Sequence, residues 1–169
     1  MTKNTSTTSV PTNSPTSSAP KRSLTPRRRA REYALQGVYQ SLVMRRAGSL
    51  PNAATIAKQL AEDPGFRRCQ LDLFQGIFAG VLERTDELEG LITPALDRPI
   101  NELSPVEHAA LLIGTYELAM DIAVPYKVAI NEAVELAKTF GGTDGHKYVN
   151  GVLDLLAQKL RATEVQAKT

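Results

Sequence analysis

Apolar residues recur at helical spacing from Pro26 almost to the end of the chain, and this periodicity restricts the fold more than any other feature. Ala and Leu form the largest class of apolar side chains, whereas aromatic residues amount to 5% and Trp is absent. Since Ala and Leu favour helices and no segment has a convincing strand pattern, the sequence predicts an all-α fold. We expect about seven helices, joined by short loops that favour antiparallel bundles.

Capping signals mark where several of these helices begin. Thr25 is a candidate N-cap, and Pro26 suits the first position of a helix. Ser104-Pro105-Val106-Glu107 is the best local signal, because it holds all the parts of a capping box. A third helix is expected over about 66–84, where Gly76 and Gly80 are interpreted as close-packing positions.

The N-terminal segment has a different composition from the rest of the chain. Of the first 20 residues, 14 are Ser, Thr or Pro, and none is aromatic. Such a segment buries too little apolar surface to offset the entropy of ordering, so we expect residues 1–24 to be a disordered tail. The helical domain is then expected at 25–162, followed by a short C-terminal tail at 163–169.

Several functional classes lack their sequence signals. Cys69 is the single cysteine, so an internal disulfide and a cysteine zinc cage are excluded. There is no run of 18 apolar residues, no apolar core of a secretory signal, no catalytic triad spacing, no phosphate loop and no dinucleotide fingerprint. We therefore expect a cytoplasmic protein that is not an enzyme, crosses no membrane and needs no metal or cofactor.

Charge is distributed unevenly along the chain. Residues 21–46 carry eight Lys or Arg and one Glu, whereas residues 47–169 carry 11 basic and 17 acidic side chains. A basic arm on an acidic body indicates a polyanionic partner at one end and a different partner on the remainder.

The basic run at the start of the first helix is locally unfavourable. Arg27, Arg28, Arg29 and Arg31 place positive charge where the helix dipole prefers anions. Local rules tend to break at functional sites, and arginine matches phosphate geometry, so the run is a candidate for nucleic-acid binding. A solvated face or a targeting tract is the alternative. Helical spacing aligns Arg31 with the apolar stripe, where it either lies beyond the packed part of the helix or pairs with a carboxylate.

Four other positions are candidate site residues. Tyr39 lies at the edge of the apolar stripe, as a half-buried core residue or as a docking surface. Asp144 suits an N-cap, while Lys147 and Tyr148 could contact a phosphate and stack on a base.

Several segments resemble the NusB family. The residues at 27–36 are similar to its opening helix, those at 124–141 to its most characteristic segment, and those at 146–153 to its closing signature. Glu107 and residues 116–118 match the helix between, so the resemblance covers about residues 26–160. Two departures are the Ser/Thr-rich tail and Gly145, where the family commonly has Ser.

The resemblance implies two three-helix bundles with an extra helix shared, and a role in bacterial transcription antitermination. Members of the NusB family pair with the small-subunit ribosomal protein NusE and bind boxA RNA in ribosomal RNA operon leaders. The pair then joins the RNA polymerase elongation complex with other Nus factors. The implied RNA-facing residues are Arg27, Arg28, Arg29, Arg31, Asp144, Lys147 and Tyr148, and the implied partner-facing residues are Tyr39 and Glu107.

Two alternative functions stay open from the sequence. A NusB-like domain also occurs fused to an RNA cytosine methyltransferase, although these 169 residues hold no S-adenosylmethionine-binding βαβ pattern and no catalytic cysteine motif. The other alternative is a helical protein-interaction module, such as a homo-oligomer that hides its arginine face.

Overall fold

The computed structural model describes residues 24–167, and within that range the chain is all-helical. The predicted tail, apart from Leu24, lies outside the described residues. The eight α-helices of the described range are Pro26–Arg46 (α1), Ala53–Ala61 (α2), Leu71–Glu83 (α3), Thr85–Ile92 (α4), Pro105–Met120 (α5), Tyr126–Phe140 (α6), Gly145–Leu160 (α7) and Ala162–Ala167 (α8). Short 3-10 turns occur at Pro64–Arg68 (η1), Thr93–Ala95 (η2) and Ile100–Glu102 (η3). None of the helices in residues 24–167 is long and apolar enough to cross a membrane.

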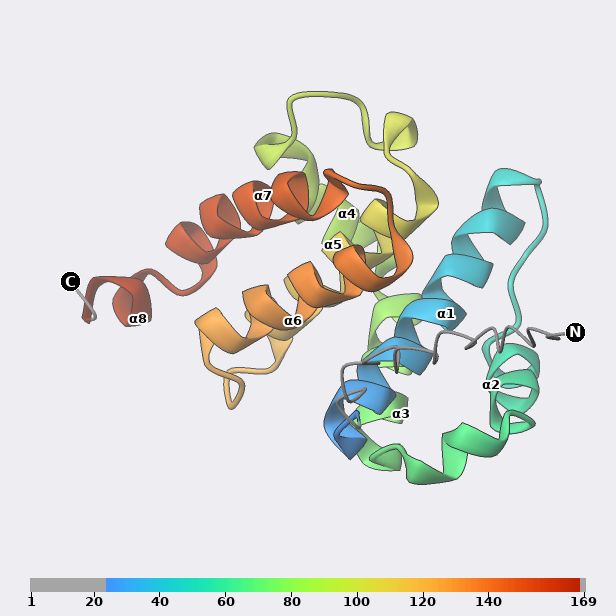
Figure 1. Cartoon of the computed structure of the whole chain (residues 1–169). Helices are drawn as coiled ribbons and strands as arrows, with labels where there is room; N and C mark the ends of the chain where they lie inside the picture. The colour runs from blue at the N-terminus through green and yellow to red at the C-terminus, as the bar shows by residue number, and fades with distance from the viewer. Residues whose placement is uncertain (1–23, 168–169) are drawn as a thin grey trace, which may run out of the picture.

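The helices form two groups that meet at α5 (Figure 1). One group is α1, α2 and α3, and the other is α5, α6 and α7. α4 packs mainly on α5 and also contacts α3 and α7. The expected pair of three-helix bundles with an additional shared helix is therefore confirmed.

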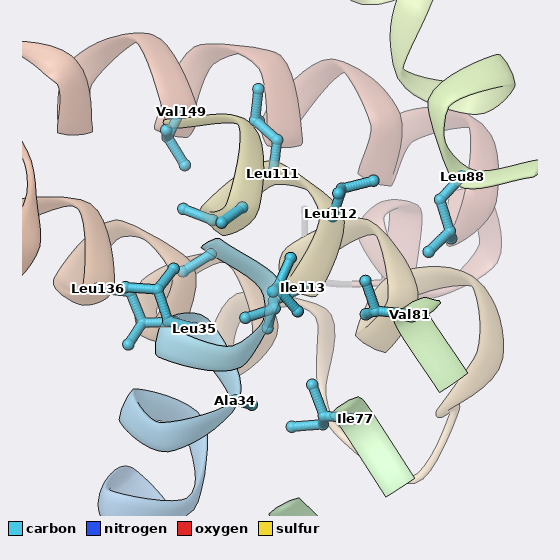
Figure 2. Close-up of a cluster of buried hydrophobic side chains, with 14 of the residues drawn as sticks. Ala34, Leu35, Ile77, Val81, Leu88, Leu111, Leu112, Ile113, Leu136 and Val149 are labelled. Carbon is cyan, nitrogen blue, oxygen red and sulfur yellow. The ribbon is translucent and has the colours of Figure 1, made fainter. Parts of the chain in front are cut away.

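α5 supplies the centre of the core because it is buried on nearly all sides. Leu111, Leu112 and Ile113 are consecutive and each is at most 1% exposed. A helix that is apolar all round must be covered by its neighbours on every face. Figure 2 shows the side chains that surround α5, among them Ala34 and Leu35 of α1, Ile77 and Val81 of α3, Leu88 of α4, Leu136 of α6 and Val149 of α7.

One of the two predicted close-packing glycines has that role. A Cβ on Gly80 would overlap the far end of the Tyr116 ring, so the glycine leaves room for that ring between α3 and α5. The prediction for Gly76 is wrong, because a Cβ there would meet open space.

The helix expected over 66–84 is interrupted at Cys69 and Gln70, which are extended. Phe66 packs edge-on against Tyr33 and Phe74, with ring centroids 5.1 and 5.0 Å away. The Gln70 N–H donates to the Pro26 carbonyl at 2.9 Å. The helix is broken here, and the extended residues connect η1 and α3 to the start of α1 through the bond from Gln70 to Pro26.

The C-terminal end is more helical than expected, since α8 covers most of the segment interpreted as a tail. Arg161 is buried between α7 and α8 and donates to the carbonyls of Leu118, Asp121 and Val124 at 2.7–2.9 Å. Its guanidinium also pairs with Glu164 of α8 at 2.6 Å. One side chain thus joins α8 to the α5–α6 connection.

Candidate nucleic-acid interface

The first turn of α1 is held in place by backbone and cap hydrogen bonds. The Thr25 hydroxyl oxygen accepts from the Arg28 N–H at 3.1 Å, and Pro26 occupies the first turn, as the sequence predicts. No acidic residue lies in this turn. The positive end of the helix dipole therefore adds to the arginine charges instead of being neutralised.

The four arginines of the basic run differ in their exposure. Arg27 is exposed, and Arg28 and Arg29 are half-buried. Arg31 is only 3% exposed. The run is consequently a short surface of three arginines, Arg27 to Arg29, with a fourth arginine inside the protein.

Arg28 is engaged by a glutamate of α6. Its Nη2 lies 3.3 Å from Glu132 Oε1, and its Nε donates to Oε2 at 3.4 Å. The hydrogen bond and the charge of Glu132 raise the pKa of Arg28 above its ordinary value. The Arg28 side chain is still 41% exposed, and such pairs contribute about 0–1 kcal/mol, so a phosphate can compete for it.

Arg31 forms a buried ion pair with Glu117 of α5. Its Nε donates to Oε1 at 2.7 Å and its Nη2 to Oε2 at 2.9 Å, while Glu117 is 1% exposed. Burial lowers the pKa of Arg31, but the hydrogen bond and charge of Glu117 outweigh it and the pKa is raised. The expectation that Arg31 faces RNA is corrected, because the guanidinium is buried and bonded to Glu117 through two of its nitrogens. Carboxylate pairing, the option its helical position left open, is what the structure shows.

The start of α7 holds the second group of predicted RNA-facing residues. Asp144 is at the N-cap position, but its side chain makes no capping hydrogen bond. Its carboxylate instead lies 3.4 Å from Lys147 Nζ, and both side chains are more than 70% exposed.

Tyr148 is joined to a loop that sequence reasoning did not single out. Its hydroxyl donates to Asp97 Oδ1 at 2.9 Å, and the Arg98 guanidinium carbon is 4.3 Å from its ring centroid. Burial, followed by the bond to Asp97, raises the pKa of Tyr148. The Arg98 and Tyr148 hydrogen bonds lower the pKa of Asp97. The predicted stacking residue is thus half-buried and already carries a guanidinium over its ring.

Glu107 completes the predicted capping box and lies beside Gly145 at the start of α7. Its carboxylate accepts from the Ser104 N–H at 3.3 Å, and the Ser104 hydroxyl accepts from the Glu107 N–H at 3.2 Å. A Cβ on Gly145 would be 2.6 Å from Glu107 Oε1. Glycine at this position therefore leaves room for the carboxylate in its capping geometry.

Tyr39 lies on a groove of about 650 Å³ between α1 and the ends of α5 and α6. Its side chain is 42% exposed, and Val43 and Phe140 are similarly exposed beside it. Val106 lines the same groove and directly precedes Glu107 in α5. The two predicted partner-facing positions therefore lie near the same end of α5, with an exposed apolar surface at Tyr39.

Within residues 24–167, no group of three or more His, Cys, Asp or Glu side chains is arranged to hold a metal ion. Sequence reasoning missed Asp97 and Arg98, since a loop between prolines carries no periodicity that would place them beside α7. It also did not identify Glu132 as the partner of Arg28, because nothing in the spacing of two helices 104 residues apart predicts their contact.

Comparisons with known proteins assign most of the chain to one family. The NusB family model matches residues 28–158. The chain is 53% identical over 141 residues to the transcription antitermination protein NusB of Bordetella pertussis, which covers 83% of this chain and 91% of that protein. It is 56% identical over 138 residues to the protein of that name from Nitrosospira multiformis. This match covers 82% of this chain and 84% of that protein.

Two solved structures have the same fold. T. maritima NusB superposes with a TM-score of 0.67 at 29% identity, covering 80% of this chain and 92% of that one. A chain from a complex of the antitermination factors NusB and NusE with double-stranded RNA superposes with a TM-score of 0.67 at 23% identity. The match covers 79% of this chain and 97% of that one. The matched model and the identity over most of the chain show that the protein belongs to the NusB family.

Proposed function

We propose that the protein is an RNA-binding transcription antitermination factor. In this proposal it pairs with the small-subunit ribosomal protein NusE, binds boxA RNA of ribosomal RNA operon leaders, and joins the RNA polymerase elongation complex with other Nus factors. Its role is regulatory and not enzymatic, and its place of action is the cytoplasm.

The observation that carries the RNA-binding proposal is the surface formed by Arg27, Arg28 and Arg29. These arginines are at least partly exposed at a helix start that has no acidic residue in its first turn. Guanidinium groups bind phosphates through paired hydrogen bonds, and a helix N-terminus favours anions. RNA is the polyanion that a member of this family would meet there.

The second RNA-facing surface in the proposal is the start of α7. Lys147 is 74% exposed, and its pair with Asp144 is a solvent-exposed one that a phosphate can replace. Tyr148 anchors the neighbouring loop through Asp97. Glu107 bonds the Ser104 N–H and lies beside Gly145, so it is near both this surface and the end of the groove lined by Val106.

The groove beside Tyr39 supports a protein partner. Tyr39, Val43 and Phe140 expose apolar surface together, and aromatic side chains of this kind are enriched at interfaces. The acidic excess of residues 47–169 suits a basic ribosomal protein. In the proposal NusE contacts Tyr39 and Glu107 and leaves the arginines for RNA.

RNA binding measured with and without the ribosomal partner tests the function. We expect a labelled boxA RNA to bind the chain with NusE more tightly than it binds either protein alone, and more tightly than a scrambled RNA. Equal binding of both RNAs by the mixture would contradict boxA recognition. Light scattering measures the mass of the free protein and so detects a homo-oligomer that hides the arginines. Such an assembly would have to dissociate before RNA binds.

A further inference from the structure

Arg98 is held in one orientation by two contacts from different parts of the chain. Its Nε donates to Asp97 Oδ1 at 2.8 Å and its Nη2 to Oδ2 at 3.4 Å. Its guanidinium carbon also lies 4.3 Å from the centroid of the Tyr148 ring. A planar group bonded through two nitrogens and covering a ring is pre-organised compared with a free surface arginine.

Asp97 is in turn fixed by Tyr148. The Tyr148 hydroxyl donates to Asp97 Oδ1 at 2.9 Å, and the Asp97 N–H donates to the same hydroxyl oxygen at 3.3 Å. The loop before η3 is therefore fastened to α7 by the residue whose ring Arg98 covers.

In the stacked pair, the Arg98 guanidinium is more exposed to solvent than the Tyr148 ring. Tyr148 is half-buried and packs against the hydrophobic core. The Arg98 side chain, in contrast, is 43% exposed. A nucleotide that approaches the start of α7 would meet the guanidinium that covers the ring.

We propose that Arg98 is the stacking surface for one base of a single-stranded RNA, with Asp97 and Tyr148 as its positioning residues. The inference rests on the proposed RNA-binding function. Guanidinium planes stack on bases as they do on aromatic rings. The adjacent Asp97 carboxylate offsets the positive charge and repels a phosphate, so this site favours a base over the RNA backbone.

The test compares Arg98→Ala and Arg98→Lys with the wild-type protein, using a labelled single-stranded boxA RNA in the presence of NusE. Stacking of one base corresponds to a five- to hundredfold change in Kd, so Arg98→Ala should weaken binding by about that factor. Arg98→Lys keeps the charge but loses the plane, and should bind nearly as weakly as Arg98→Ala. The slope of log K against log salt should change by less than the value of about 0.7 expected for one phosphate contact.

Arg84→Ala is the matched control. Arg84 is 47% exposed and pairs with a nearby carboxylate, Glu87, much as Arg98 pairs with Asp97. Its guanidinium contacts the Met120 sulfur at 3.5 Å, and we expect its removal to leave the Kd within twofold of the wild type. Tyr148→Phe keeps the ring and removes the bond to Asp97, so it should weaken RNA binding less than Arg98→Ala.

The outcomes separate this inference from the proposed function. Wild-type binding together with unchanged binding by Arg98→Ala would overturn the inference alone. Full rescue by Arg98→Lys would also overturn it, because charge without a plane would then suffice. If the wild-type protein with NusE does not bind the RNA, the proposed function fails, and this inference fails with it.

Discussion

The first turn of α1 and the first turn of α7 were both expected to face RNA, yet they are built from different interactions. At α1, two arginines pair with different glutamates. Arg31 forms a buried ion pair with Glu117, whereas Arg28 forms a partly exposed ion pair with Glu132. At α7, the single cation Lys147 is fully at the surface, and the aromatic residue is covered by Arg98. In the proposed function, α1 contributes charge to RNA binding, whereas Arg98, which covers the Tyr148 ring at the start of α7, contributes an oriented planar surface.

The largest expected effect is the loss of the buried pair at α1. Arg31→Ala leaves the Glu117 carboxylate buried without its partner, and removing one member of a buried pair costs about 3–5 kcal/mol. Urea denaturation should therefore show a much lower free energy of unfolding. Arg28→Ala is the control, with an expected loss of no more than about 1 kcal/mol because its pair is exposed. Equal losses for the two variants would contradict the distinction between an interior and a surface arginine.

The second prediction concerns RNA affinity at α1. Replacing both Arg27 and Arg29 with Ala should reduce the slope of log K against log salt by about 1.4, the value for two phosphate contacts with single-stranded RNA. Matched and scrambled RNA should lose affinity alike, because phosphates carry no sequence information. A salt titration of RNA binding measures this slope. A reduced slope for Arg98→Ala instead would reverse the roles assigned to the two helix starts.

The third prediction concerns the groove beside Tyr39, between α1 and the ends of α5 and α6. Tyr39→Asp places a charge in an apolar groove and should weaken NusE binding about tenfold or more, the range of an aromatic interface residue. Calorimetry measures the affinity, and circular dichroism should show an unchanged helical spectrum since the side chain is 42% exposed. Tyr39→Phe retains the ring and should bind nearly normally. Normal binding by Tyr39→Asp would place the partner elsewhere.

A smaller effect is expected at the capping box beside α7. Glu107→Ala removes the bond to the Ser104 N–H and should lower stability by about 0.5–1 kcal/mol. The exposed Glu83→Ala provides the baseline for removing a surface carboxylate. If Glu107→Ala also weakens NusE binding, the partner surface extends from Tyr39 to this position, whereas a pure stability loss would limit Glu107 to capping.

The smallest effect is a shift of one titration at α7. The hydrogen bond from Arg98, followed by that from Tyr148, lowers the pKa of Asp97. Arg98→Ala should therefore raise the Asp97 pKa toward its ordinary value, and carboxyl NMR over an acid titration measures it. The wild-type network is intact above the ordinary carboxyl pKa and is lost as the pH falls through the lowered one. An Asp97 pKa that does not move would show that Arg98 is not held by this carboxylate in solution.

Much of the local structure could be predicted from the sequence because its causes are local. The capping box at Ser104 and the start of α1 at Pro26 depend on side chains within one helical turn. The interruption of the helix at Cys69 and Gln70 could not, since the Gln70 N–H bonds to Pro26, more than 40 residues away in the chain. The same limitation applies to Gly76 and Gly80. Both are expected from the sequence to be close-packing positions, and only their neighbours in the folded protein distinguish them.

The candidate sites show the same division. Helical spacing put Arg31 in line with the apolar stripe, but only the crossing of α1 and α5 brings Glu117 to it and removes it from the RNA-facing set. Tyr148 was a candidate for stacking on its residue type, and only the packing of the loop at Asp97 and Arg98 on α7 shows that its ring is covered.

The sequence by itself determined the all-helical fold, the positions of most helix starts, the separation of basic and acidic regions, and the resemblance to the NusB family, because periodicity, capping and composition act within a few residues. The tertiary structure decided which arginines remain at the surface, which carboxylates pair with them, and which group covers Tyr148. Those outcomes depend on contacts between residues up to 104 positions apart in the sequence, and a buried charge such as that of Arg31 is tolerated only where such a contact supplies its partner.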